Sequence, residues 1–460
     1  MADRRPEAFA VPGATGAAGA MILAFALLAF ALLAFAGIAF AVLHIDDRPG
    51  LFAGVILGAY SLSIYFGPIG TLTGLFALLV SAARLARRVE RPILAAEAAL
   101  LCWVALCLLG LFYSWYVDNA VKHAAMLIGL ALSSYLYGRA FGDHPRFVTD
   151  FLLACSAALL LCEPGFILQG GVSTMRLSGS LNAVGASVLV DTPIVGCLAF
   201  LILGETRNRK AFAGVAAFLV FLVLPIAVSL GTRGVFAGAA AALAVLLVRR
   251  LAAGGIGRLA GTVSVAGGIV VLGLGVLSTD GGAEILRGVT RITTNFAADG
   301  TVTTDGATLD RLDHFQEAAR LVAQAPVFGH GLGAFFPLSN SRIVRTLDPA
   351  TDDVPHNLEL EILVNTGFVG LALFLAGFLP IALAGLRAMF RKPLDWTSGF
   401  VFCALLDSFF RHQLSLSVVD GKTLFLLLGL AAARNHPSAQ TNGAHARNAA
   451  VAHPIPLGGR

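Results

Sequence analysis

Hydrophobic residues occur in long uninterrupted runs along this chain, and polar residues gather in short segments between them. Most of the runs approach or exceed the ~20 residues that an apolar helix needs to cross a bilayer. A window of that length predicts about twelve crossings, at approximately 19–43, 52–82, 93–115, 121–138, 147–168, 184–203, 211–230, 234–248, 259–277, 362–386, 396–410 and 414–432. The second range is too long for one straight helix, and Gly67-Pro68 is expected to break it.

Composition excludes a soluble protein. Hydrophobic residues make up 57% of the 460 positions and charged residues only 13%, against about 25% charged residues in a soluble chain. A soluble domain of this kind would expose far too much apolar surface to water. The first apolar run, from about Gly16 to Leu43, exceeds the roughly 7–15-residue core of a signal peptide and is expected to remain as a helix. We therefore predict an all-α polytopic membrane protein with one membrane domain over 1–432.

The positions of basic residues predict the orientation of the chain. If the N-terminus is inside, most of the 32 Lys and Arg fall in short loops on the inner side, which is the bias that sets topology. Both termini are therefore predicted to be cytoplasmic, and the Ala-, Asn-, His- and Gly-rich residues 433–460 are expected to form a disordered tail. The net charge of +5 lies in scattered clusters, so nucleic-acid binding is not expected.

One long polar loop, roughly 278–357, separates the ninth and tenth predicted crossings. It contains ten Asp and Glu against six Arg, and a structureless loop of this length is unusual unless it is functional. At its centre, residues 308–324 carry apolar side chains at helical spacing: Leu309, Leu312, Phe315, Ala319 and Val322. We expect an amphipathic helix near the outer, periplasmic interface. A helix that serves only packing is the alternative.

Four arginines are predicted to lie on the outer side: Arg176, Arg233, Arg311 and Arg320. A cation at a membrane boundary is costly without a partner, and the arginine fork matches phosphate oxygens. For each one, a snorkelling or salt-bridged side chain is the structural alternative. Convergence of several on one face would favour an anionic ligand such as a diphosphate.

His356 lies where the long loop returns to the membrane, in the sequence Val-Pro-His-Asn-Leu-Glu-Leu-Glu. An imidazole can take a proton from a hydroxyl group near neutral pH, although a structural histidine is the alternative. Asn357 could cap the following helix. His314 and His330 are weaker candidates. The chain has no His-Glu-x-x-His sequence and no acidic cluster with metal-ligand spacing, so neither a metal nor another cofactor is predicted.

Asp191, Asp407 and Arg411 are charged residues within or near the apolar runs. Asp407 and Arg411 are four residues apart on one helix and are expected to neutralise each other, and Asp191 is a similar intramembrane acid. Either acid could line a transport pathway. However, internal repeats and paired intramembrane ion ligands, which many transporters have, are not evident.

Three stretches carry a resemblance to a known family. They are Arg176-Leu-Ser-Gly-Ser-Leu-Asn182, then Ser229-Leu-Gly-Thr-Arg233-Gly, and a long third stretch. The third begins with Arg311-Leu-Asp-His-Phe315, continues with Ala325-Pro-Val-Phe-Gly-His-Gly-Leu-Gly-Ala-Phe335, and ends with His356-Asn-Leu-Glu-Leu-Glu-Ile-Leu-Val-Asn-Thr-Gly367. Together they resemble the O-antigen ligase and polymerase superfamily of bacterial envelope proteins over about 170–370. Phe315 replaces that family's usual Trp, and Glu359 stands where an aromatic residue is common.

The resemblance implies an enzyme of the bacterial inner membrane with its active site facing the periplasm. Such proteins transfer a glycan from undecaprenyl diphosphate to lipid A core, to a growing polysaccharide or, in some branches, to a protein. It further implies a metal-independent inverting transfer, with Arg233 and Arg311 on the diphosphate and His356 activating the acceptor hydroxyl. Arg176, Arg320 and Asn357 complete the predicted substrate-binding set. We expect a ligase of lipopolysaccharide biosynthesis, with a polysaccharide polymerase as the first alternative and a solute transporter as the second.

Overall fold

The fold was analysed in a computed structural model of the 460-residue chain. The structure describes residues 44–55, 69–87, 94–114, 116–162, 183–204, 209–230, 233–253, 306–340, 354–391, 394–413, 417–418 and 421–435. In this part of the chain every regular element is a helix, as predicted. The N-terminal run, the crossing at 259–277, Gly67-Pro68, Arg176 and residues 436–460 of the tail lie outside the described residues. Residues 433–435, predicted to be part of the disordered tail, instead end a helix.

The helices have the following bounds: α3 (Ile69–Arg87), α4 (Ala95–Leu109), α5 (Val117–Met126), α6 (Ser133–Phe141), α7 (Phe147–Cys162), α10 (Ala183–Leu203), α11 (Arg209–Phe218), α12 (Leu224–Leu230), α13 (Arg233–Ala252), α16 (Gly306–Gln324), α17 (Phe335–Leu338), α18 (Leu358–Phe390), α19 (Trp396–His412) and α20 (Lys422–Asn435). The 3-10 helix η1 (Gly110–Phe112) extends α4. The π-helical segments η2 (Leu127–Leu132) and η3 (Leu219–Val223) join α5 to α6 and α11 to α12.

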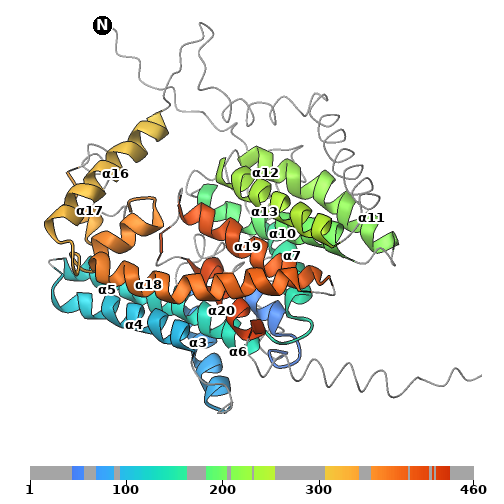
Figure 1. Ribbon diagram of the computed structural model, residues 1–460, viewed down its shortest axis with the longest axis horizontal. Coiled ribbons are helices and arrows are strands. Elements are labelled where there is room, and N and C mark those ends of the chain that lie inside the picture. The colour runs from blue at the N-terminus through green and yellow to red at the C-terminus, as the bar shows by residue number, and fades with distance from the viewer. Residues whose placement is uncertain are drawn as a thin grey trace, which may run out of the picture.

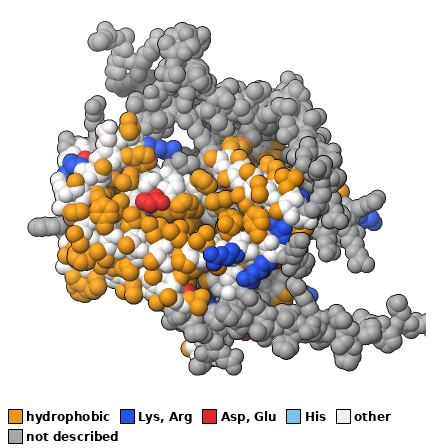
Figure 2. Space-filling model, viewed as in Figure 1, with side chains coloured by type: hydrophobic (Ala, Val, Ile, Leu, Met, Phe, Trp, Pro, Cys, Tyr) orange, Lys and Arg blue, Asp and Glu red, His pale blue; other side chains and the backbone are white. Residues whose placement is uncertain are grey.

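Five segments of the described chain are long and apolar enough to cross a membrane: Ala95–Phe112, Val117–Phe141, Lys210–Ala227, Val235–Ala252 and Leu358–Phe390. Shorter apolar helices cover Phe147–Leu160 and Leu189–Leu203. Hydrophobic side chains are spread over large parts of the described face in Figure 2, as a lipid-facing surface requires. The protein is therefore a multi-pass membrane protein, and the total of twelve crossings stays a prediction.

The last helix differs from its prediction. A crossing was expected over 414–432, but α20 begins only at Lys422, and the described residues 417, 418 and 421 are not helical. Two hydrogen bonds explain the late start of α20. The hydroxyl of Ser417 and the backbone N–H of Val418 donate to the carboxylate of Glu361, at 2.6 and 2.8 Å. These two residues therefore bond to α18 instead of starting α20.

Helices α13 and α19 pack closely and run antiparallel. Gly238 lies so near α19 that an added methyl group would be 1.8 Å from Oδ1 of Asp407. Four residues further along α13, the carbonyl of Ala242 is 3.7 Å from Sγ of Cys403. Because the two helices run antiparallel, the first turn of α13, which begins at Arg233, lies toward the end of α19.

The charged groups inside the bundle are partnered across helices. Arg411 of α19 donates to Asp191 of α10, a pairing that the sequence did not indicate. Asp407 is near enough to both residues to interact with them electrostatically. Arg139 likewise donates to Glu97. Because an unpaired charge is expensive in the membrane, these groups are expected to hold the helices together.

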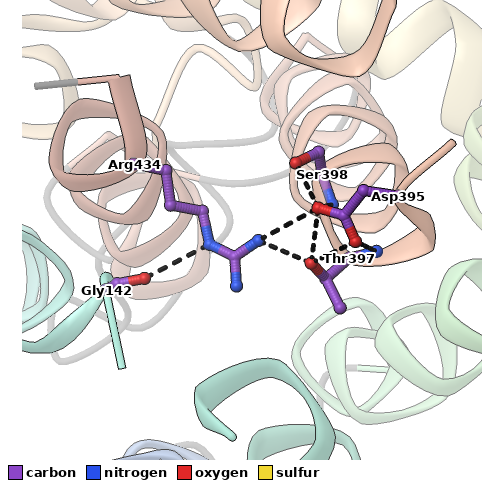
Figure 3. Close-up of polar contacts among 5 residues, drawn as sticks. All are labelled: Gly142, Asp395, Thr397, Ser398 and Arg434. Atoms are coloured by element: carbon purple, nitrogen blue, oxygen red, sulfur yellow. Dashed lines mark hydrogen bonds and ion pairs between the residues drawn. The ribbon is translucent and has the colours of Figure 1, made fainter. Parts of the chain in front are cut away.

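Arginines join the helix ends at the end of the bundle where α18 and α20 finish. Arg249 donates to the carbonyls of Met389 and Arg391, at 2.6 and 2.8 Å. Arg434 lies between the carbonyl of Gly142 and the first turn of α19, which Asp395 caps (Figure 3). This end carries the short basic loops, so it is the end predicted to be cytoplasmic.

Cysteine labelling tests this orientation. In a cysteine-free background, an impermeant thiol reagent added outside should modify Gln316→Cys on α16 and spare Lys210→Cys on α11, because both positions are exposed and lie on opposite sides in the predicted topology. After membrane permeabilisation both should react. Labelling of Lys210→Cys alone in intact cells would reverse the topology and place the candidate site in the wrong compartment.

Candidate active site

A glycine-rich turn fixes the loop helix α16 to the start of α18. Gly329, Gly331 and Gly333 all have positive φ, at 68°, 92° and 67°, a conformation that glycine adopts without steric cost. The N–H groups of His330 and Gly331 donate to the carbonyls of Val364 and Asn365, at 2.8 and 3.0 Å. The third stretch of the family resemblance therefore forms one connected structure.

The turn is accommodated by an interruption of α18 at Gly367, where φ is 64°. The N–H groups of Phe368 and Val369 donate to the carbonyls of Pro326 and Val327, at 2.8 and 3.2 Å. These two bonds replace helical hydrogen bonds that the interruption removes, so the N–H groups of Phe368 and Val369 remain satisfied. In Figure 1, α16 and α17 lie at the end of the bundle that also holds α5 and the beginning of α18.

The predicted loop helix is confirmed as α16, Gly306–Gln324, but its packing face is not the apolar series seen in the sequence. The buried side chains are His314, Glu317, Ala318 and Leu321, whereas Leu312 remains 52% exposed. Two of the four buried residues are polar: Glu317 accepts hydrogen bonds from Arg320 and Asn340, and His314 contacts the rings of Phe335 and His356. A pattern of apolar residues alone could not identify this face.

His356 has an unusual backbone conformation. Its φ is 55°, and it is the one non-glycine residue with positive φ in the described part of the chain. Its ring lies edge-to-face with that of His314, with centroids 5.5 Å apart, and His314 in turn contacts Phe335 at 5.7 Å. Three segments of the long loop, α16, α17 and the residues before α18, therefore meet around His356.

Asn357 anchors His356 from the other side. Its Oδ1 accepts a hydrogen bond from the N–H of Leu360 at 3.0 Å, which confirms the predicted N-cap. Its amide donates to Oε1 of Gln413 at 3.0 Å, and Gln413 donates to Glu359 at 2.9 Å. The cap of α18 is thus tied to the end of α19.

Glu361 is a buried acid one turn into α18. It accepts the hydrogen bonds of Ser417 and Val418 and interacts electrostatically with His123 and His356. The sequence analysis assigned no role to it, or to Gln413 and Ser417. An acid that directly follows the loop's return into an apolar helix was a signal that could have identified Glu361.

The structure brings three of the predicted residues to the same end of the bundle. Arg311 precedes His314 by three positions on α16, so the two lie on one side of the helix. Arg233 begins α13, at the end of that helix that lies toward the end of α19, and Gln413 at the end of α19 bonds to Asn357. Helix packing connects α13 to α19, α19 to α18 and α18 to α16.

Arg320 has the contacts of a structural ion pair. It donates to both carboxylate oxygens of Glu317, at 2.5 and 3.0 Å, and to the carbonyl of Leu338 at 3.1 Å. Glu317 also accepts the N–H of Asn340 at 2.5 Å. These bonds hold the residues after α17 against α16. Arg320 therefore forms the salt bridge that was the structural alternative to substrate binding.

Acid should weaken this ion pair. The hydrogen bonds from Arg320 lower the pKa of Glu317 below its usual value, so its stabilisation is present above the unfolded pKa, about 4.3, and is lost as the pH falls through the folded pKa. Because Arg320 is partly exposed, the contribution should not exceed about 1 kcal/mol. The melting temperature of wild type should exceed that of Glu317→Gln at pH 7, and this difference in melting temperature should shrink below about pH 4. An equal difference at both pH values would contradict this assignment.

These features define a polytopic membrane protein in which a strained histidine, a buried acid and the segments that carry two arginines meet at one boundary of the bundle. Residues 218–375 match the O-antigen ligase family. This match supports the resemblance of the sequence to the O-antigen ligase and polymerase superfamily. The matched segment contains Arg233, Arg311 and His356. No curated protein matches the chain significantly.

Proposed function

We propose that this protein transfers a glycan from undecaprenyl diphosphate to lipid A core or a similar acceptor at the periplasmic face of the inner membrane. The O-antigen ligase family, which residues 218–375 match, indicates glycan transfer of the ligase or polymerase type. The finer assignment rests on the residues gathered at the outer end. The observation that carries it is His356, held at φ 55° against His314 at the point where the loop rejoins the membrane. Backbone strain of this kind costs about 1–3 kcal/mol and clusters at active sites.

The proposed reaction needs one base and one anion clamp. His356 takes the proton of an acceptor hydroxyl while its oxygen attacks the anomeric carbon of the donor sugar. The bond from that carbon to the phosphate oxygen breaks, the configuration inverts, and undecaprenyl diphosphate leaves with the bonding electrons. Glu361 favours the imidazolium that forms, in the way that a carboxylate supports a catalytic histidine. Arg233 and Arg311 stabilise the diphosphate, whose negative charge increases as the bond breaks.

Glycan analysis of a deletion strain tests the function and separates its two forms. Carrier-linked polymer that no longer reaches the acceptor would support the ligase. Single repeat units on the acceptor, in place of long chains, would instead identify a polymerase. An unchanged envelope glycan together with lost uptake of a solute would support a transporter and overturn the proposal.

Metal independence is a separate expectation. If arginines supply the charge stabilisation that a divalent cation gives elsewhere, the purified enzyme should retain most of its transfer activity in excess EDTA. Among the described residues, no three His, Cys, Asp or Glu side chains are grouped as metal ligands. Loss of activity in EDTA that Mg²⁺ or Mn²⁺ restores would contradict it.

A further inference from the structure

We propose that a cavity between the start of α5 and α17 binds a sugar of the acceptor glycan. The cavity has a volume of about 620 Å³ and is lined by Tyr116, Val117, Asp118, Asn119, Lys122, Phe336 and Pro337. It lies outside the set of residues predicted from the sequence. The inference rests on the proposed function, which it deepens by naming where the acceptor is held.

The cavity is built on a fixed framework. The amide of Asn119 donates to the carbonyl of Gly333 at 2.6 Å, and Gly333 has no room for a side chain, because an added methyl would be 3.0 Å from Asn119 and 3.1 Å from His123. The glycine-rich turn therefore holds α17 against α5. Phe336 and Pro337 form one wall, and the first turn of α5 forms the other.

The lining has the chemistry that sugars require. The rings of Tyr116 and Phe336 can stack on the apolar face of a pyranose, since aromatic side chains combine apolar area with defined geometry. Asp118 and Lys122 are exposed, are four residues apart on α5 and so lie on one face of that helix. They can accept from and donate to hydroxyl groups. A few polar groups on a largely apolar wall are typical of a small-molecule site.

The position of the cavity favours the acceptor over the donor. Phe336 follows Phe335, whose ring contacts His314, and His314 contacts His356. Phe336, which lines the cavity, is therefore adjacent in sequence to Phe335, and Phe335 is connected through His314 to the proposed base His356. Arg233 begins α13, which packs on α19, whereas the cavity lies between α5 and α17. A diphosphate bound at Arg233 and a sugar in the cavity would therefore be held by different helices.

Steady-state kinetics with the purified full-length protein test this assignment. The donor is the undecaprenyl-diphosphate-linked glycan, and the acceptor probe is core oligosaccharide released by mild acid from lipopolysaccharide of the host strain. Phe336→Ala should raise the acceptor KM about tenfold, the equivalent of about 1.4 kcal/mol, with the donor KM and kcat little changed. Asp118→Asn, at an exposed position, should raise the same KM without any risk to packing.

Phe328→Ala is the matched control, because Phe328 is 55% exposed at the same end of the protein but does not line the cavity. Its acceptor KM should equal that of wild type. Binding of the oligosaccharide alone, measured by saturation-transfer NMR in nanodiscs, should decrease in Phe336→Ala and Asp118→Asn and persist in His356→Ala. Unchanged acceptor KM and binding in both cavity variants would overturn the site. If wild type transfers no glycan, the proposed function fails, and loss of oligosaccharide binding in the cavity variants would still support a glycan site.

Discussion

Replacing His356 by alanine is expected to lower the rate of glycan transfer by about 10²–10⁴-fold, the usual effect of removing a general base. Binding of the lipid-linked donor should persist, because His356 is proposed to act on the acceptor hydroxyl and not on the diphosphate. Single-turnover transfer and donor binding, measured on the same preparation, check these expectations.

Because the backbone of His356 is left-handed, its role in holding the turn can be tested separately from its role as a base. Asparagine tolerates this conformation better than most residues, so His356→Asn should preserve the turn and fold while remaining as inactive as His356→Ala. Glycine should relieve the strain, and His356→Gly is expected to melt at or above the wild-type temperature without regaining activity. His144→Ala, at the opposite end of the protein, is the control and should transfer normally. Normal transfer by His356→Asn would remove His356 from the mechanism.

Arg233→Lys and Arg311→Lys are expected to damage the enzyme although both retain the positive charge. The planar fork of arginine can bond two phosphate oxygens at once, whereas an ammonium group cannot reproduce that geometry. The diphosphate is charged in the bound donor and gains charge as the sugar leaves, so each substitution should raise the donor KM and lower kcat. About tenfold or more in kcat/KM is expected for each, given about 1.5–3 kcal/mol for a hydrogen bond to a charged group.

Arg387→Lys provides the matched control for these variants. Arg387 is an exposed arginine in the last turn of α18, at the opposite end from His356. Its replacement should leave both kinetic constants unchanged. If Arg233→Lys and Arg311→Lys behave in the same way as Arg387→Lys, the arginines only snorkel or form salt bridges, and the anion clamp must be sought elsewhere.

The sequence predicted those parts of the fold that follow from local patterns. Apolar runs identified most of the described helices, the helical spacing over 308–324 identified α16, and a polar residue before an apolar helix identified the cap Asn357. Each of these features depends on residues within one helical turn of each other. The positions of these helices and of this cap are therefore readable without knowledge of the tertiary structure.

Features that depend on contacts between distant segments were not predictable in this way. The late start of α20 follows from Glu361, which lies 56 residues before Ser417. The buried face of α16 includes His314 and Glu317 because their partners come from other parts of the loop. The pairing of Arg411 with Asp191 spans 220 residues. A hydrophobic pattern records whether a residue is apolar, but it contains no information about which distant group satisfies a buried polar one.

The most direct test of the central claim is a reconstituted reaction in nanodiscs that contain only the purified protein, the undecaprenyl-diphosphate-linked glycan and the acceptor oligosaccharide. Undecaprenyl diphosphate and glycosylated acceptor are quantified together over time. The account predicts equal amounts of the two products with wild type and neither product above background with His356→Asn. Release of undecaprenyl diphosphate without glycosylated acceptor, or equal product formation by the two proteins, would contradict it.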